Sequence, residues 1–231
     1  MIEVRKAEQR GRANFGWLDS KHTFSFGSYY DPKHMGFSEL RVINDDKVTP
    51  SAGFETHGHR DMEIISYVLS GTIAHKDSAG NIKTLPAGEF QLMSAGRGIY
   101  HSEFNASDSE SLSFLQIWIQ PNSFGGEPGY QQKDFGQAPG LTTIATPTGE
   151  DGTLHIKQDA RLLQLILAPH SALTYDVPQG RRVYVHQIDS TLAINDVTLN
   201  PGDGARIAKE SQLELRNDSD LPVKALVFDL P

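Results

Sequence analysis

Short runs that alternate or mix hydrophobic and polar residues dominate the chain, and few of them exceed nine residues. Examples are "EIISYVLSG", "LSFLQIWIQ", "RRVYVHQI" and "KALVFDL". They are rich in β-branched and aromatic residues, and Gly, Pro, Asn or Asp separates them, which is typical of β-strands joined by turns. No segment of useful length has a helical period. The pattern predicts an all-β protein, folded as a sandwich or a barrel.

Two segments resemble each other and divide the chain. Residues 69–93 and 188–207 both consist of a strand, a hairpin turn and a short strand, followed by Pro-Ala-Gly or Pro-Gly-Asp. Between them, residues 121–140 are rich in Gly and Pro, as expected of a linker. This similarity predicts a duplicated fold with an N-terminal domain at residues 1–129 and a C-terminal domain at residues 130–231.

The amino-acid composition excludes several kinds of metal site and binding partner. The 231 residues include no cysteine and carry a net charge of -8. Thiolate metal sites and disulfides are therefore excluded, and the missing basic stripe argues against direct binding of nucleic acid or an anionic membrane. The first residues are charged where a signal peptide would be apolar, and the most apolar later segment, "LLQLILA", is too short to span a bilayer. We expect a cytoplasmic protein whose partner is a small molecule or another protein.

Two pairs of potential metal ligands stand out. His57 and His59 are two residues apart at the start of a predicted strand, and His101 and Glu103 repeat that spacing. Side chains two apart on a strand project from the same face, so each pair can reach one ion. If the two strands are neighbours, three imidazoles and one carboxylate converge. We therefore predict a metal site made of His57, His59, His101 and Glu103.

The donor set suits one divalent transition metal. Three nitrogen donors and one oxygen donor, without sulfur, are typical of iron(II), manganese, nickel, copper or cobalt. Structural zinc sites are more often closed and rich in cysteine. Glu63 has the same strand parity as His57 and His59, and two roles stay open for it: a fifth ligand, or a group that orients a histidine. The other histidines lack a matching partner and are expected at the surface or hydrogen-bonded in the core; His75, next to charged residues, is expected at an exposed hairpin end.

These motifs resemble the cupin pattern and, more specifically, the pirin family. Gln91 stands where a general cupin has its last histidine, and pirins resemble this chain in taking their remaining ligands from a later His-x-Glu. The segment at 16–46 also looks like the pirin N-terminal signature, although pirins commonly have proline where Gly58 lies between the histidines. The positions that match the cupin motifs are His57, His59, Glu63, Gly71, Gly80, Pro86 and Gly88.

The resemblance implies two tandem cupin β-barrels of jelly-roll type, with metal in the N-terminal barrel alone. In the second half, Asp176 and Pro178 fall near the positions of His57 and His59. Bacterial pirins similar to this chain act as quercetin 2,3-dioxygenases, which open flavonols with dioxygen and release carbon monoxide. A flavonol and dioxygen would then be the substrates, Fe(II) the first choice of metal before Mn, Ni, Cu, Co or Zn, and Glu103 the catalytic base.

Two other functions compete with the dioxygenase. Eukaryotic pirins resemble redox-responsive regulators that act through protein partners, and the acidic charge of this chain allows a protein partner. A cupin isomerase or decarboxylase would need basic residues near the metal, and Arg60 and Arg97 are the ones close in sequence. Apolar residues near the motifs, Phe54, Met93 and Trp118, could line a pocket for a flat substrate, but ordinary core positions are the favoured interpretation.

Overall fold

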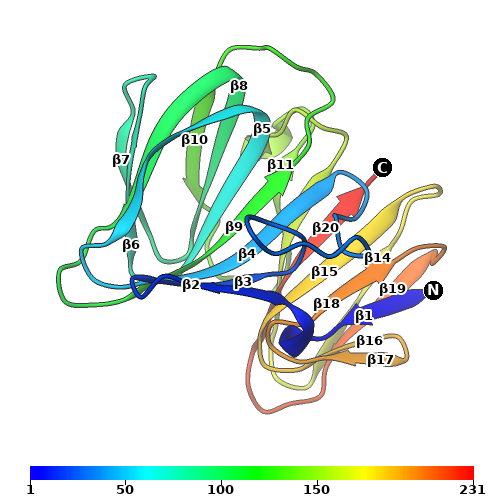
Figure 1. Cartoon of the computed structure of the whole chain (residues 1–231). Helices are drawn as coiled ribbons and strands as arrows, with labels where there is room; N and C mark the ends of the chain where they lie inside the picture. Colours follow the sequence, from blue (N-terminus) through cyan, green and yellow to red (C-terminus); the bar gives the residue numbers. More distant parts are fainter. The chain divides into compact units, whose positions relative to one another are not determined.

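Antiparallel strands account for most of the chain in the computed structural model, which describes all 231 residues (Figure 1). The only helical elements are two three-residue 3-10 turns, η1 (Ala7–Gln9) and η2 (Glu150–Gly152). The all-β prediction is therefore confirmed. No helix has the length and apolar character that crossing a membrane requires.

Contacts within the chain define two compact units. The N-terminal unit comprises residues 11–136 and 156–158, and the C-terminal unit comprises residues 1–10, 137–155 and 159–231. Strand β1 (Ile2–Arg5) belongs to the C-terminal unit because it pairs with β18 (Gly204–Ile207). Strand β10 (Gly129–Asp134) belongs to the N-terminal unit because it pairs with β8 (Glu89–Asn105). The division into domains at residue 130 stays a prediction.

The N-terminal unit is built on one nine-stranded sheet. Its order is β2-β3-β4-β9-β5-β8-β6-β7, and β10 adds to β8. Strands β5 and β8 are the longest, and their pairing places the two histidine-bearing segments side by side. The remaining bounds are β2 (Gly11–Asn14), β3 (Leu18–His22), β4 (Leu40–Val48), β5 (Gly53–Ser70), β6 (Thr72–Asp77), β7 (Ile82–Pro86) and β9 (Leu112–Ile119).

The C-terminal unit contains two sheets. The larger has the order β1-β18-β15-β20-β13-β11-β12, and the smaller has the order β14-β19-β16-β17. Its buried interior is a continuous cluster of Leu, Val, Ile and Ala side chains. The bounds are β11 (Gly140–Thr146), β12 (Leu154–His155), β13 (Arg161–Leu167), β14 (Ser171–Asp176), β15 (Arg182–Asp189), β16 (Leu192–Ile194), β17 (Val197–Leu199), β19 (Gln212–Asn217) and β20 (Val223–Leu230).

A layer of polar side chains interrupts the apolar interior of the N-terminal unit. Along β5, Ile64 and Val68 belong to different apolar clusters, and Ser66 lies between them. Ser66 pairs with Gln91 on one side and with Gln116 on the other, and all three side chains are buried. We call Ser66, Gln91 and Gln116 the polar layer. It gives the interior of this unit hydrogen-bonding groups that an apolar core lacks.

A register shift separates the histidine-bearing part of β5 from this layer. The pairing with β8 is irregular between His59 and Asp61, and Asp61 has φ of 63°. On β8, Gly96 has φ of 50°, and a Cβ there would lie 2.1 Å from the carbonyl oxygen of Gly126. Only glycine suits this position, because the backbone conformation and the close approach both exclude a side chain. The bulge thus lies directly next to the candidate site.

Candidate metal centre

Three imidazole nitrogens meet where β5 and β8 pair. His57 and His59 project from β5, and His101 on β8 is the direct cross-strand partner of His57. The Nε2 atom of His101 lies 3.0 Å from Nε2 of His57 and 3.1 Å from Nε2 of His59. The structure therefore brings together the three histidines that the sequence predicted as ligands.

These separations fit neighbouring positions around one ion. Two nitrogen ligands at about 2.1 Å from a metal and at right angles to each other lie ~3.0 Å apart. Nδ1 of His57 donates a hydrogen bond to the carbonyl oxygen of Glu55 at 2.7 Å, which leaves Nε2 as the ring nitrogen with a free lone pair. The residues present thus fit a bound transition metal.

The environment keeps the rings of His59 and His101 neutral. Burial, with the nearby His101 and His57 rings adding to it, lowers the pKa of His59 to about 4. Burial also lowers the pKa of His101 to about 3, and the charges of His57 and His75 act in the same direction. A metal binds the deprotonated imidazole, so the two nitrogens are in the form that coordination requires at neutral pH.

Glu103 lies on the other side of His101. It is buried, and a ligand atom of its carboxylate lies within 4.8 Å of ligand atoms of His101 and His75, in a group separate from the one with His57 and His59. All three residues of the polar layer donate hydrogen bonds to it: Ser66 Oγ at 3.2 Å and Gln91 Nε2 at 3.1 Å to Oε1, and Gln116 Nε2 at 2.9 Å to Oε2. His101 is therefore the residue shared by both groups of potential ligands.

Glu63 belongs to neither group of potential ligands. Its carboxylate is completely buried, and Oε2 accepts hydrogen bonds from Ser94 Oγ at 3.0 Å and from the backbone amide of Lys157 at 3.1 Å. The register shift after His59 changes the direction of the β5 side chains that follow, so the parity argument from sequence does not carry through to Glu63.

The prediction for His75 is wrong. Its side chain is buried and not at an exposed hairpin end, because β6 pairs with β8 and places His75 directly opposite Glu103. His75 Nε2 lies 2.8 Å from Asp77 Oδ2, and the ring centroids of His75 and His101 are 5.5 Å apart. The available signal was the His-x-Asp spacing, which puts both side chains on one strand face.

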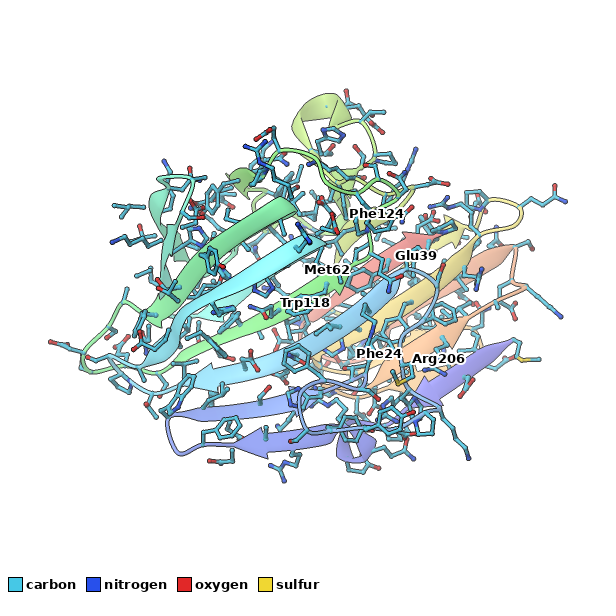
Figure 2. The ribbon with its side chains drawn as sticks, turned by 45° about the horizontal axis from the view of Figure 1, so that its top comes forward. Phe24, Glu39, Met62, Trp118, Phe124 and Arg206 are labelled. Atoms are coloured by element: carbon cyan, nitrogen blue, oxygen red, sulfur yellow. The ribbon has the colours of Figure 1, made fainter.

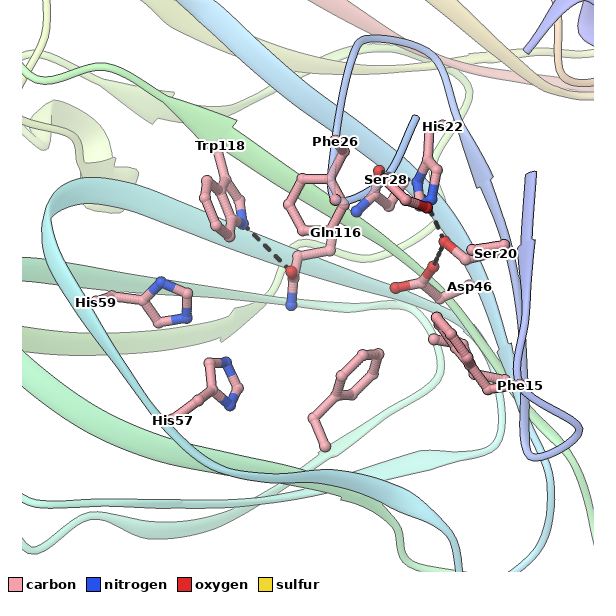
Figure 3. A pocket seen from close by; sticks show the side chains of 15 residues that line it. Phe15, Ser20, His22, Phe26, Ser28, Asp46, His57, His59, Gln116 and Trp118 are labelled. Atoms are coloured by element: carbon pink, nitrogen blue, oxygen red, sulfur yellow. Dashed lines mark hydrogen bonds between the residues drawn. The ribbon is translucent and has the colours of Figure 1, made fainter. Parts of the chain in front are cut away.

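A mostly apolar cavity opens beside the histidines (Figure 3). Its volume is about 320 Å³, within the range of small-molecule sites. Phe54 and Trp118 line it, contrary to the favoured expectation that they are only core residues, whereas Met93 is fully buried in an apolar cluster. Trp118 lies beside Met62 where β9 and β5 pair (Figure 2). The cavity can therefore hold a flat aromatic molecule against His57 and His59.

The two arginines that a decarboxylase or isomerase would need do not line this cavity. Arg60 and Arg97 are both exposed. Arg60 donates to the backbone carbonyl of Arg97, and Arg97 forms an ion pair with Glu127. A carboxylate or phosphate substrate would therefore find no cationic partner in the cavity wall.

The C-terminal unit contains no comparable group. Both clusters of three potential ligands lie in the N-terminal unit. Asp176, at the position that matches a ligating histidine, is exposed, and its side chain accepts a hydrogen bond from Gln212 at 2.8 Å. That metal binds in the N-terminal barrel alone stays a prediction.

Comparisons with known proteins agree with this architecture. The pirin family model matches residues 3–119, and a model described as the quercetinase C-terminal cupin domain matches residues 143–230. A quercetin 2,3-dioxygenase of Escherichia coli K12 is 48% identical over 231 residues, which cover 100% of this chain and 99% of the relative. A pirin-like protein of Caulobacter vibrioides is 42% identical and covers 93% of this chain and 94% of its own.

A solved structure has the same fold. The bacterial pirin YhhW from Escherichia coli, crystallised in complex with nickel(II), superposes with a TM-score of 0.96 at 47% identity and covers 100% of this chain and 99% of its own. The predicted pair of tandem cupin β-barrels is thereby confirmed. The match extends over both halves and includes the segment that bears the histidines. This chain is a member of the pirin family.

Proposed function

We propose that this protein is a metal-dependent quercetin 2,3-dioxygenase, which opens flavonols with dioxygen. The observation that carries the proposal is the convergence of the Nε2 atoms of His57, His59 and His101 at the wall of an aromatic cavity. The name of the Escherichia coli relative, which shares 48% of its residues with this chain, supports the same activity.

His57, His59 and His101 would hold the metal, with Fe(II) as the resident ion, and Glu103, from the second group of potential ligands, would be the fourth ligand. When bound, a divalent transition metal supplies a Lewis acid that lowers the pKa of a chelated hydroxyl group. The related pirin has been crystallised in complex with nickel(II), which supports a divalent metal ion in this protein. Mn, Ni, Cu, Co and Zn are the alternatives for the same donor set.

The protein residues bind and orient the substrate. Phe54 and Trp118 provide apolar surface for the flavonol rings and exclude water from the histidine end of the cavity. Glu103 would take the proton of the flavonol 3-hydroxyl at a carboxylate oxygen. The hydrogen bonds from Gln91 and Gln116 fix that carboxylate, so little reorganisation accompanies the proton transfer.

Turnover with defined metals tests the proposal. The metal-free protein is loaded under nitrogen with iron, manganese, nickel, cobalt or copper, quercetin and air are added, and flavonol bleaching is followed together with carbon monoxide. We expect both signals with at least one metal. Metal binding without turnover for every metal would contradict the enzyme and favour a regulatory protein.

The variant Glu103→Gln distinguishes two roles of this residue, catalytic base and metal ligand. The amide cannot accept the proton at neutral pH, so we expect kcat to fall by about 100-fold or more, while metal affinity falls far less. Glu110→Gln, at an exposed position, is the matched control and should leave both quantities unchanged. Equal loss of metal affinity and kcat would mean that Glu103 acts only as a ligand.

A further inference from the structure

The cavity has a second polar end, away from His57 and His59. Ser20, His22, Asn44 and Asp46 line it, and we call these four residues the distal wall. We propose that the distal wall is a binding subsite for a phenolic hydroxyl group, on the ring of the substrate farthest from the histidines. This inference rests on the proposed function, because it assigns the specificity of the same cavity.

Strand pairing places the four side chains together. Ser20 and His22 are two apart on β3, so they share a face, and β4 presents Asp46 opposite Ser20 and Asn44 opposite His22. All four are buried, with relative exposures of 2–4%. Figure 3 shows Ser20, His22 and Asp46 across the cavity from His57 and His59. These residues lie within the segment at 16–46 that resembles the pirin N-terminal signature, and none of them belongs to a group of potential metal ligands.

The distal wall is only partly satisfied by its own hydrogen bonds. Ser20 Oγ donates to Asp46 Oδ1, and His22 Nδ1 lies 2.8 Å from Asn44 Oδ1. The other oxygen of Asp46 has no hydrogen bond from the protein, and it points toward the cavity interior in Figure 3. A carboxylate oxygen that faces a mostly apolar cavity without a donor is costly, so a ligand that brings a donor is favoured there.

The rest of the cavity defines which donor fits. Phe15, Phe26, Phe54 and Trp118 also line the cavity, and no lysine or arginine lines it. An anionic group would therefore meet Asp46 without a counter-charge. Burial raises the pKa of Asp46 to about 7, with the charges of Asp45 and Glu103 adding to the shift and the Ser20 hydrogen bond opposing it. A neutral aromatic hydroxyl is the chemistry that satisfies all of these contacts.

Binding under nitrogen, where no turnover occurs, tests the subsite. Equilibrium dialysis compares quercetin with 3-hydroxyflavone, which keeps the chelating hydroxyl and carbonyl but lacks every other hydroxyl. We expect wild type to bind quercetin more tightly than 3-hydroxyflavone. Asp46→Asn should lower the affinity for quercetin by about tenfold and change the affinity for 3-hydroxyflavone by no more than about twofold. Asp45→Asn, the same change on a neighbour whose side chain projects from the other face of β4, should change neither affinity.

Equal affinity of wild type for the two flavonols overturns the inference, and this holds even if Asp46→Asn does not fold. Equal weakening of both ligands by a folded Asp46→Asn overturns it as well, because the residue would then act on the cavity as a whole. Turnover in air separates the two proposals. A preference for quercetin without turnover would support the subsite and contradict the dioxygenase. Turnover without a preference for quercetin would support the dioxygenase and contradict the subsite.

Discussion

The two units share a barrel-like β architecture and differ in what fills it. In the C-terminal unit, the side chains of β13 and β20 that point into the core are apolar on both strands. The cross-strand pairs Leu163–Val227 and Leu165–Ala225 are examples. In the N-terminal unit, Ser66 on β5 pairs with Gln91 and with Gln116, and these polar side chains lie between two apolar clusters. A polar layer therefore occupies the interior of one unit, whereas apolar side chains fill the interior of the other.

The polar layer is tolerated because its buried groups satisfy one another and Glu103. The amide of Gln91 donates to Glu103, and its carbonyl oxygen accepts a hydrogen bond from Tyr130 at 3.0 Å. Gln116 likewise donates to Glu103 and accepts from Trp118 at 3.2 Å. Such connected networks stabilise a unique arrangement, whereas an isolated polar group would destabilise the unit. The N-terminal unit therefore holds its candidate site through hydrogen bonds, and the C-terminal unit depends on apolar burial.

The largest expected effect is the loss of the metal. His101 contributes to both groups of potential ligands, so His101→Ala should lower metal affinity by about 1000-fold or more and abolish turnover. Metal per chain after dialysis is the measurement. The control is His170→Ala, an exposed histidine of the C-terminal unit that pairs with Asp220. Full metal occupancy in His101→Ala would exclude His101 as a ligand.

Core truncation should show the second difference between the units. Leu165→Ala removes a fully buried side chain from the apolar cluster, and we expect the free energy of unfolding to fall by about 3 kcal/mol. Ser66→Ala at the polar layer removes one weak donor to Glu103 and should cost about 1 kcal/mol. Urea denaturation measures both variants. Equal costs would mean that the polar layer is as important for stability as the apolar core.

Asp46 should make stability depend on pH. Its pKa is raised from 3.8 to about 7 in the folded protein, so the folded state keeps a proton that the unfolded state releases between these values. The contribution of Asp46 to the free energy of unfolding is therefore fully present below about pH 4 and is lost as pH rises toward 7. The free energy of unfolding of metal-free Asp46→Asn, relative to that of metal-free wild type, should therefore rise by about 2 kcal/mol between pH 5 and pH 8. A constant difference across this range would show that Asp46 titrates normally.

The smallest expected effect concerns the glycine between the two histidines. A Cβ at Gly58 would lie 3.1 Å from the ring of Tyr100, which is 63% exposed and can move aside. Gly58→Ala should therefore raise the free energy of unfolding by about 0.5 kcal/mol, because it restricts the unfolded chain. Thermal unfolding measures the change. Destabilisation would show that the Tyr100 ring is fixed and cannot move away from the added methyl group.

Local patterns predicted the parts of the site that lie within single strands. The His57 and His59 pair follows from the two-residue period of a strand, and it converges with His101 as expected. Properties that depend on pairing between distant strands were missed. The charged neighbours of His75 indicated exposure, yet pairing with β8 buries it, and a register shift redirected Glu63. The distal wall escaped notice for the same reason, since β3 and β4 are separated by a long loop.

The short segment 156–158 has a consequence for the path of the chain. It belongs to the N-terminal unit although it lies between two segments of the C-terminal unit, and its Lys157 amide donates to the buried Glu63. A protein cut after residue 129 would lose this donor and the β10 partner of β8. The polypeptide is thus interleaved, and the half that carries the histidines needs a strand and three residues from beyond the cut to complete its fold.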